Sequence, residues 1–384
     1  MNFELTEELA MLQQVAREFA ETELREESRK MDREEEFNKD VFKKMADLGL
    51  TGLTIPEQYG GAGLYDVKLG NQAASVVLEE INRVCASTGV TLSVHMSLFS
   101  SLLTKWGNEE QKTRVLPKMA SGEWLGAYAL SEAEAGTDAG SVACAAVKDG
   151  DEYVLNGSKL WITSAPYADV FIIMASTDLS ARSRGISSFL VEADNPGLSV
   201  GKKEKKMGIR GSATSEVILE NCRIPVANLI GKEGEGFKIA LDTLDGGRIG
   251  IAAQGVGIGR ACIEHATQYS KEREQFGKAI SKFQAIQWML ADSATDLDAA
   301  RLLMYRAAWL RDNKRPCAKE AAMAKLKASI AANKAAKDAV QIYGGNGYSK
   351  EYDVERYFRD ARITEIYEGT TEVQRIVIAR AMLA

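Results

Sequence analysis

The stretch that decides the fold is DGDEYVLNGSKLWITS, residues 149–164, near the middle of the chain. It joins β-branched and aromatic residues to two turn dipeptides, Asp149-Gly150 and Asn156-Gly157, a combination typical of β-hairpins. Similar short apolar runs lie on both sides of it, among them GAYALS, DVFIIMAS, GISSFLVEA and SEVILENCRIP. So many short runs predict a small antiparallel barrel or sandwich in the middle of the chain.

Both flanks of this β segment show helical patterns. From Thr6, a candidate N-cap, to about Glu123, apolar residues recur at three- and four-residue spacing, interrupted by the loop PEQYGGAGL at 56–64. Three long helices are expected after the β segment, at 237–276, 279–313 and 317–345, the last of them rich in alanine. We therefore expect an α+β multidomain protein with an all-α domain at 1–123, a β-barrel domain at 124–232 and an α-helical bundle domain at 233–384.

The bulk composition argues against several classes of protein. The chain has 384 residues and a formal net charge of −6, whereas nucleic-acid binders usually show a basic face. No apolar run approaches the roughly 18 residues of a spanning helix, and the N-terminus lacks a signal-peptide pattern, so we expect no membrane insertion. Five single cysteines and only two histidines predict neither a metal site nor a disulfide framework, and they favour a reducing, cytoplasmic compartment.

Three motifs have both a structural and a functional interpretation. GVGIGRA at 255–261 resembles a dinucleotide fingerprint, but no strand precedes it, and close helix packing through small residues explains it better. The run GKKEKKMGIR at 201–210 indicates a solvated charged face more often than a site for an anionic ligand. His95, in the apolar context VTLSVHMSLF, is better explained as a core histidine than as a ligand.

The segment RITEIYEGTTEVQR, residues 362–375, places a carboxylate, Glu368, directly before the last expected helix. Thr370 or Thr371 is the candidate N-cap of that helix. Glu368 could be a solvated loop charge, or it could be a base held in a dry pocket with a tuned pKa. The residues of this segment alone leave both interpretations open.

Three loops carry groups that suit a flat, largely neutral ligand. YALSEAEAGTDAGS at 128–141 offers hydroxyls, backbone N–H groups and a glycine that permits close approach. LWITS at 160–164 adds an indole for stacking and a hydroxyl for hydrogen bonding. VQIYGGNGYS at 340–349 predicts a helix end with paired glycines, whose amides could also bind a pyrophosphate.

Taken together and in this order, YALSEAEAGTD, LNGSKLWITS, LDGGRIGIAAQ, VQIYGGNGYS and RDARITEIYEGTTEVQR resemble the motifs of the acyl-CoA dehydrogenase family. REQFGK, followed by ISKFQAIQWMLAD, adds to a resemblance that covers essentially the whole chain and is closest to the short-chain, or butyryl-CoA, branch. It implies an N-terminal helical domain, a central antiparallel β-barrel and a C-terminal four-helix bundle, with FAD between the barrel and the helices. It also implies a homotetramer, a dimer of dimers, whose neighbouring subunits share FAD.

The resemblance also assigns ligand contacts residue by residue. The isoalloxazine ring would be contacted by Tyr128, Leu130, Ser131, Gly136, Thr137, Trp161, Ile162 and Thr163. The FAD of a neighbouring subunit would be reached by Arg273, Gln284, Gln341, Gly344 and Gly345, and the adenosine diphosphate part by Thr370 and Glu372. Contacts to acyl-CoA match Thr137, Asp245, Arg248 and Gly369.

Glu368 matches the catalytic base of the family. The implied reaction is α,β-dehydrogenation of a short-chain acyl-CoA to trans-2-enoyl-CoA, as in fatty acid β-oxidation. Glu368 removes the pro-R α-proton, a β-hydride passes to flavin N5, and electrons continue to electron-transferring flavoprotein. The Glu368 N–H and a ribityl hydroxyl of FAD would stabilise charge on the thioester oxygen. Some members carry the base at the position of Gly247, and the family usually has proline and a small residue where Ala133 and Glu134 stand.

Two alternatives stay open at this point. One is a flavoenzyme of the same fold that acts on a branched-chain, cyclic or decarboxylating acyl-CoA, or an oxidase that passes electrons to dioxygen. The other is a catalytically silent flavin-binding or helical scaffold protein. The joint presence of Glu368, Arg248 and the flavin loops argues against the second alternative.

Overall fold

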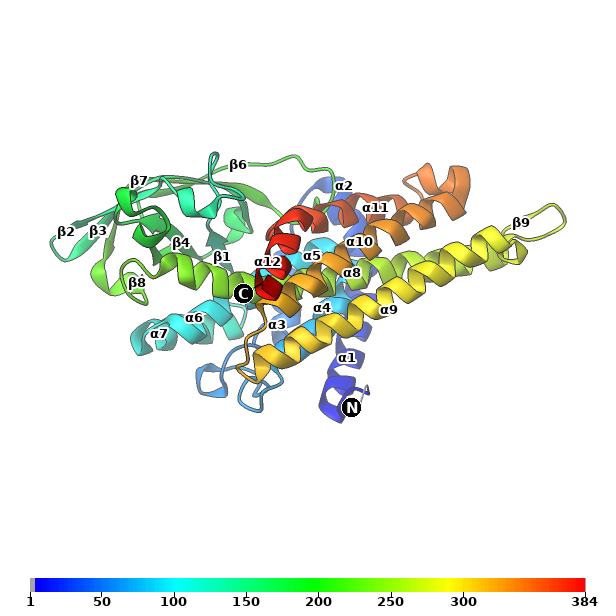
Figure 1. Cartoon of the computed structure of the whole chain (residues 1–384), viewed down its shortest axis with the longest axis horizontal. Helices are drawn as coiled ribbons and strands as arrows, with labels where there is room; N and C mark the ends of the chain where they lie inside the picture. The colour runs from blue at the N-terminus through cyan, green and yellow to red at the C-terminus, as the bar shows by residue number, and fades with distance from the viewer. Residues whose placement is uncertain (1–3, 384) are drawn as a thin grey trace.

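The computed structural model describes residues 4–383, whose elements follow the expected order of helical, β and helical parts (Figure 1). The first part consists of α1 (Glu7–Phe19), α2 (Arg25–Glu34), α3 (Lys39–Asp47), α4 (Gly70–Val84), α5 (Ala86–Ser93), α6 (Ser101–Trp106) and α7 (Glu109–Ala120). Two π-helical segments, Ala20–Leu24 and Val94–Ser100, continue α1 and α5 without a break. Thr6 caps α1 as predicted, because its side chain accepts a hydrogen bond from the Leu9 N–H.

The middle of the chain forms an eight-stranded sheet within the described residues. Its strands are β1 (Gly126–Ala129), β2 (Ala145–Asp149), β3 (Glu152–Thr163), β4 (Val170–Ser176), β5 (Ile186–Glu192), β6 (Leu198–Lys203), β7 (Thr214–Pro225) and β8 (Leu229–Ile230). The strand order is β6-β7-β3-β2-β4-β5-β8, and β1 pairs with β4 in parallel. The predicted β part is therefore confirmed, but the prediction of a purely antiparallel sheet is wrong, because β1 and β2 both pair with β4 in parallel. Closure of the sheet into a barrel stays a prediction.

The two turn dipeptides of the β segment have different roles. Asp149-Gly150 joins β2 to β3, and Gly150 has the positive φ of 61° that a tight turn needs. Asn156-Gly157 lies inside β3 instead, where the pairing with β7 shifts register between Leu155 and Gly157. A Cβ on Gly157 would lie 2.8 Å from the Cα of Cys144, so this glycine permits a close approach of two backbones.

The last part of the chain consists of α8 (Gly236–Glu272), α9 (Gln284–Asp312), α10 (Ala318–Tyr343), α11 (Val354–Arg362) and α12 (Thr371–Leu383). With 37 residues at about 1.5 Å each, α8 is roughly 55 Å long. Figure 1 shows α8, α9 and α10 running together away from the sheet, with the short α12 lying across them near the middle of the molecule. The long helices therefore connect the sheet to a distant end of the molecule.

A short hairpin at that distant end corrects the predicted helix limits. Arg273 already leaves the helical conformation, and β9 (Glu274–Gln275) then pairs with β10 (Lys278–Ala279). The predictions of helix up to residue 276 and again from residue 279 are therefore wrong. Phe276 and Gly277 have positive φ angles of 54° and 74°, which a two-residue hairpin turn requires and a helix excludes.

Glycines in the middle of α8 explain GVGIGRA. A Cβ on Gly255 would lie 3.0 Å from the Ala328 carbonyl oxygen of α10, and a Cβ on Gly257 would lie 2.5 Å from the Glu79 carbonyl oxygen of α4. A Cβ on Gly259 would lie 2.5 Å from Leu297 of α9. The interpretation as small residues that let helices approach closely is confirmed.

The other ambiguous motifs also have structural explanations. His95 is fully buried, its Nε2 lies 3.1 Å from the Met119 carbonyl oxygen, and burial lowers its pKa to about 4. It is a core histidine, as predicted. In the basic run, Lys203 pairs with Glu36 and Arg210 pairs with Glu35, so this run contacts the N-terminal helices.

Three further properties concern the range 4–383 as a whole. All five cysteines are buried and free. No helix in this range combines the length and the apolar character that crossing a membrane needs. Nor does this range bring three or more His, Cys, Asp or Glu side chains together in a way that could hold a metal ion.

Candidate active site

Glu368 stands in a strained turn between α11 and α12. Its φ is 51° and that of Gly369 is 87°, so two consecutive residues adopt the left-handed conformation. For a residue other than glycine, this conformation costs about 1–2 kcal/mol, and it is commonest where the surrounding structure enforces it. Thr370 then accepts a hydrogen bond from the Val373 N–H at 3.4 Å, which confirms it as the cap of α12.

Glu368 is half-buried, and one of its two carboxyl oxygens is removed from solvent. Its Oε2 atom is buried and accepts no hydrogen bond from the described residues. Burial raises the pKa of Glu368 from its ordinary 4.5 to about 7, although the positive charges of Lys325 and Arg248 oppose this shift. The buried Oε2 atom and the raised pKa favour the second interpretation of Glu368, a base with a tuned pKa, which stays a prediction.

Gly247 of α8 provides the space that this carboxyl group fills. A Cβ built on Gly247 would lie 1.9 Å from Oε2 of Glu368 and 2.8 Å from Cδ2 of Leu98. The carboxyl group therefore lies directly over the missing side chain of Gly247. Positions 247 and 368 face the same small volume, although 121 residues separate them in the sequence.

Two buried side chains donate hydrogen bonds to the backbone carbonyl groups of the turn. The Lys325 ammonium of α10 donates a hydrogen bond of 2.5 Å to the Gly369 carbonyl oxygen. The Gln374 amide donates to the same oxygen at 2.7 Å and to the Glu368 carbonyl oxygen at 3.3 Å. Both side chains are completely buried, so the two carbonyl groups of the turn point into the protein.

Asp245 and Arg248 lie beside this turn on α8. Their side chains form an ion pair of 2.7 Å, and Nε of Arg248 is buried without a hydrogen-bond partner among the described residues. Burial raises the pKa of Asp245, against the charges of Arg248 and Arg311. The structure therefore brings Asp245, Arg248 and Gly369 to the same region as Glu368.

The charge of the same carboxyl group acts on the hydroxyls of two tyrosines. The Tyr128 hydroxyl, at the end of β1, is buried without a partner among the described residues, and burial together with the charge of Glu368 raises its pKa. Tyr367 donates a hydrogen bond to Oε1 of Gln254, and its pKa is raised by burial and then by Glu368. Leu130, which follows β1, is buried as well.

The loop after β1 is anchored by a buried ion pair. Lys159 is completely buried, and its ammonium donates to Oε1 of Glu132 at 2.6 Å and to the Leu130 carbonyl oxygen at 3.1 Å. The Glu132 carboxylate also accepts hydrogen bonds from the N–H groups of Ala143 and Cys144. Glu132 therefore ties both ends of the loop to β3.

The tip of this loop is open to solvent. Gly136 and Thr137 are exposed, and a Cβ built on Gly136 would meet nothing within 4 Å. Ser131 is half-buried, and its carbonyl oxygen accepts the Leu160 N–H at 2.9 Å. Ala133 and Glu134, which depart from the family pattern, are exposed and lie in the turn that Glu132 and Ala135 close by reciprocal backbone hydrogen bonds.

A β-bulge at the end of β3 lies beside this loop. Pairing with β7 shifts register between Lys159 and Ile162, and Trp161 in this bulge has a φ of 61° and a 63% exposed side chain. Bulges of this kind redirect side chains next to functional sites. Ile162 is buried, Thr163 is half-buried, and the Ser164 hydroxyl is buried without a partner among the described residues.

Most of the remaining predicted contacts, Glu372 excepted, are not near Glu368 in this chain. Arg273 lies 25 positions after Arg248, which corresponds to roughly 37 Å along α8. It is joined at the distant end of the helices by four exposed residues, namely Gln284 and Gln341 of α9 and α10, and Gly344 and Gly345 of the 3₁₀ turn that follows α10. Stacking of Tyr269 on Tyr343, with centroids 4.0 Å apart, holds the ends of α8 and α10 together. Glu372 is exposed on the first turn of α12.

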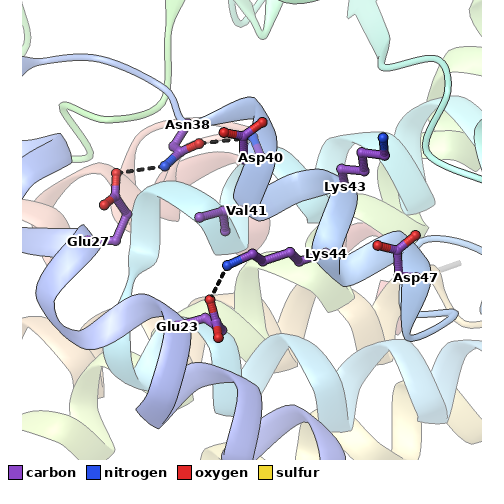
Figure 2. Close-up of a pocket in the computed structure, with 8 residues that line it drawn as sticks. All are labelled: Glu23, Glu27, Asn38, Asp40, Val41, Lys43, Lys44 and Asp47. Carbon is purple, nitrogen blue, oxygen red and sulfur yellow. Dashed lines mark hydrogen bonds and ion pairs between the residues drawn. The ribbon is translucent and has the colours of Figure 1, made fainter.

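A polar cavity of about 420 Å³ lies elsewhere, among the N-terminal helices (Figure 2). It is lined by Glu23, Glu27, Asn38, Asp40, Val41, Lys43, Lys44 and Asp47. Lys44 pairs with Glu23 across it at 2.5 Å, and Asn38 donates to Glu27 at 2.8 Å while capping α3. Its lining includes none of the predicted site residues.

Sequence reasoning missed Lys325, Gln374, Lys159 and Glu132. Lys325 carried a detectable signal, because it lies on the same face of an alanine-rich helix as the buried Ala321 and Ala328. Lysine is almost never fully buried unless it is paired, so a lysine on such a face indicates a special role. The other three residues gave no comparable signal in the sequence.

Comparison with known proteins agrees with this architecture. The N-terminal, middle and C-terminal domain models of acyl-CoA dehydrogenase match residues 6–123, 127–222 and 234–383. The short-chain specific acyl-CoA dehydrogenase of Clostridium acetobutylicum is 47% identical over 380 residues, which cover 99% of each chain. The solved structure of butyryl-CoA dehydrogenase from Megasphaera elsdenii is 42% identical, covers 100% of both chains and superimposes with a TM-score of 0.97.

Two further solved structures bear on cofactor and partner. One, described as the electron transferring flavoprotein of Acidaminococcus fermentans, is 48% identical to this chain, with a TM-score of 0.97 and full coverage of both chains. The other, PigA with FAD and proline, is 30% identical with a TM-score of 0.95, covering 100% of this chain and 99% of PigA. The chain is therefore an FAD-dependent oxidoreductase that belongs to the acyl-CoA dehydrogenase family.

Proposed function

We propose that this protein dehydrogenates a short-chain acyl-CoA to its trans-2-enoyl-CoA, with Glu368 as the base that removes the α-proton. The observation that carries this proposal is the buried, unbonded Oε2 atom of Glu368, on a carboxyl group whose pKa is about 7. A general base works best when its pKa lies near the working pH, because it is then ionised and still accepts a proton readily. An ordinary glutamate in water would be a much weaker base.

The backbone of the turn supports this role. The carbonyl groups of Glu368 and Gly369 are held by Gln374 and Lys325 on the inner side. The Glu368 N–H donates no hydrogen bond to the described residues, and we propose that it donates to the thioester oxygen of the substrate. A fixed donor at that oxygen stabilises the negative charge that develops as the α-proton leaves.

The residues around the open loop fit the flavin of FAD. The site offers an exposed indole at Trp161, an open surface over Gly136, and buried hydroxyls of Tyr128 and Ser164 that have no partner among the described residues. Flat aromatic surface with a few polar edges is what a planar heteroaromatic ring needs. When bound, FAD supplies the acceptor for the β-hydride, which no side chain can accept. Its ring would be held by Tyr128, Leu130, Ser131, Gly136, Thr137, Trp161, Ile162 and Thr163.

The acyl-CoA would be held on the α8 side of Glu368, by Asp245, Arg248, Thr137 and Gly369. Arg248 is buried and has an unpaired Nε, so it can donate to a substrate group without losing its ion pair with Asp245. Short-chain preference is supported by the name of the Clostridium relative and by the butyryl-CoA dehydrogenase structure. Electron-transferring flavoprotein as the acceptor is supported by the description of the Acidaminococcus structure.

The distant group of predicted contacts supports a shared cofactor. Arg273, Gln284, Gln341, Gly344 and Gly345 lie together but far from Glu368, and large apolar side chains near them are exposed, including Phe276 at 93% and Tyr348 at 91%. We propose that this end packs on a second copy, where it reaches that copy's FAD, beside the adenosine diphosphate contacts of Thr370 and Glu372. We further propose that two such pairs form a homotetramer, a dimer of dimers.

The finer organisation belongs to the same proposal. We propose domains at 1–123, 124–232 and 233–384, with the sheet closed into a β-barrel and the C-terminal helices forming a four-helix bundle. The gaps between β1 and α7 and between β8 and α8 support these limits. A role in fatty acid β-oxidation follows from the proposed reaction, and a cytoplasmic location is supported by five free, buried cysteines.

The test replaces Glu368 by glutamine. In anaerobic stopped-flow experiments with butyryl-CoA, Glu368→Gln should bind FAD and substrate but reduce the flavin at least about a thousandfold more slowly, because the amide cannot accept the proton. Glu365→Gln, which removes a partly exposed carboxylate paired with Arg362, should behave like the wild type. Rapid flavin reduction by Glu368→Gln would show that another group is the base, and rapid peroxide formation in air would identify an oxidase.

A further inference from the structure

Lys325 is an unusual residue in the middle of α10. Its side chain is completely buried, and it has no salt-bridge partner among residues 4–383. Its neighbours on the helix are mostly alanine and serine, and its ammonium donates a hydrogen bond of 2.5 Å to the Gly369 carbonyl oxygen. Burying a charged ammonium for one backbone hydrogen bond is unfavourable, so stability alone does not explain this residue.

The carbonyl group that Lys325 holds belongs to the most strained part of the site. Glu368 and Gly369 are both left-handed, and left-handed glutamate persists only where other contacts enforce it. Lys325 and Gln374 are the side chains that bond the carbonyl groups of this turn. Without the ammonium, the Gly369–Thr370 peptide, whose carbonyl group it bonds, could rotate and let the turn relax toward ordinary backbone angles, and the carboxyl group would leave the space over Gly247.

We propose that Lys325 is a positioning residue for the base: it holds the left-handed turn so that the Glu368 carboxyl group stays over Gly247, and its charge keeps that group ionisable. This inference rests on the proposed function of Glu368. Lys325 does not itself touch the reacting carbon atoms in this arrangement, because its ammonium lies on the inner side of the turn. Its effect on the reaction would pass through the position and the proton affinity of Glu368.

The charges around the pair decide the direction of the electrostatic effect. Glu368 faces Lys325 from α10, Arg248 from α8, Tyr128 from β1 and Tyr367 from its own segment. Lys325 faces Glu368 and Arg248, and more weakly Glu365 and Glu372. Burial lowers the pKa of Lys325 to about 8, so it is largely charged at neutral pH. Loss of this cation would raise the pKa of Glu368.

The experiment compares Lys325→Met, which keeps the length of the side chain, with Lys325→Arg, which keeps the charge. Lys327→Met is the matched control, because Lys327 lies on the same helix but pairs with Asp296 near the surface. Each full-length holoenzyme is reduced anaerobically with butyryl-CoA from about pH 6 to about pH 9. FAD content and thermal unfolding are measured on the same samples.

For Lys325→Met we expect the apparent pKa of flavin reduction to rise by about one unit, the usual effect of losing one nearby opposite charge. A rise from about 7 to about 8 alone reduces the ionised fraction at pH 7 roughly fivefold, and misplacement of the carboxyl group should bring the loss to at least about tenfold. Lys325→Arg should keep the apparent pKa close to the wild-type value. Lys327→Met should match the wild type in both rate and pH profile.

An unchanged apparent pKa in Lys325→Met would overturn the inference, even if the variant reduced the flavin slowly. A lysine with only a structural role could lower the rate of reduction, but its loss would not shift the apparent pKa. If Lys325→Met does not fold, Gln374→Met tests the same turn: it should slow reduction without shifting the pKa, since glutamine is neutral. A wild-type rate in Gln374→Met would then count against the role of the turn. Glu368→Gln separates the two claims, since its full activity would refute the proposed base, whatever the Lys325 variants show.

Discussion

Replacing Gly247 by alanine perturbs the site at its most crowded point. The new Cβ would start 1.9 Å from Oε2 of Glu368, whereas ordinary contact begins at 3.4 Å, so the carboxyl group must retreat by about 1.5 Å. A displacement of about 1 Å at a reacting group commonly costs 10²-fold in rate. We therefore expect Gly247→Ala to reduce the flavin about a hundredfold more slowly, equivalent to about 2.7 kcal/mol of transition-state stabilisation.

The fold should tolerate this change. Alanine is favoured over glycine in a helix by about 0.5–1 kcal/mol, and this gain opposes the contact at 2.8 Å with Leu98. The displaced atom is the end of a flexible side chain, so it can move without unfolding the helix. Thermal unfolding and FAD content should consequently stay near the wild-type values, while the rate of the chemical step falls.

The assay is anaerobic stopped-flow reduction by saturating butyryl-CoA, followed by flavin absorbance. Gly246→Ala is the control, because the atoms nearest its Cβ would be those of the Arg311 guanidinium, at 3.2 Å. This control should stay within about threefold of the wild type. If Gly247→Ala were reduced equally fast with FAD bound, the Glu368 carboxyl group could not act from the position described above.

Two other predictions concern pH and cofactor binding. The rate of flavin reduction should rise with pH through an apparent pKa near 7. Because the pKa of Glu368 is higher in the folded chain than the unfolded value of 4.5, the free energy of unfolding should fall as the pH rises from about 4.5 to about 7. Glu368→Gln should therefore raise the unfolding temperature more at about pH 8 than at about pH 5, and an equal rise at both would contradict the shifted pKa. Arg273→Ala should weaken FAD retention after gel filtration roughly tenfold, whereas Lys282→Ala should not; unchanged retention in Arg273→Ala would argue against a cofactor shared between chains.

The order of helical and β parts was predictable because it depends on local patterns. Asp149-Gly150 predicted a turn, and Gly150 has the positive φ that such a turn requires. The same type of signal at Asn156-Gly157 marks a bulge within β3, because the close approach of Cys144 is a contact across the sheet. The hairpin at Phe276-Gly277 was missed because its flanks continue the helical periodicity of α8 and α9.

The chemistry of the site depended more on tertiary contacts. The sequence predicted that Glu368 precedes α12. The residues that surround its carboxyl group come from β1, α8 and α10, which are distant in the chain. Lys325 and Lys327 are two positions apart in one alanine-rich segment, yet only Lys325 is buried. A helical projection places the two lysines on different faces of the helix, so this difference was predictable. The hydrogen bond from Lys325 to the Gly369 carbonyl oxygen was not predictable, because it depends on the conformation of the turn at Gly369.

The facing positions of Gly247 and Glu368 also restrict how such a protein can change over generations. The volume between them admits one carboxyl group, since a Cβ at position 247 already intrudes on Oε2. A lineage that moved the acid between the turn at position 368 and α8 at position 247 would have to pass through a chain with either two crowded acids or none. Like charges forced together in a dry space repel strongly, so the first intermediate would be poorly ionised and the second inert. The residue allowed at position 247 therefore depends on the residue at position 368, although the two codons lie far apart in the gene.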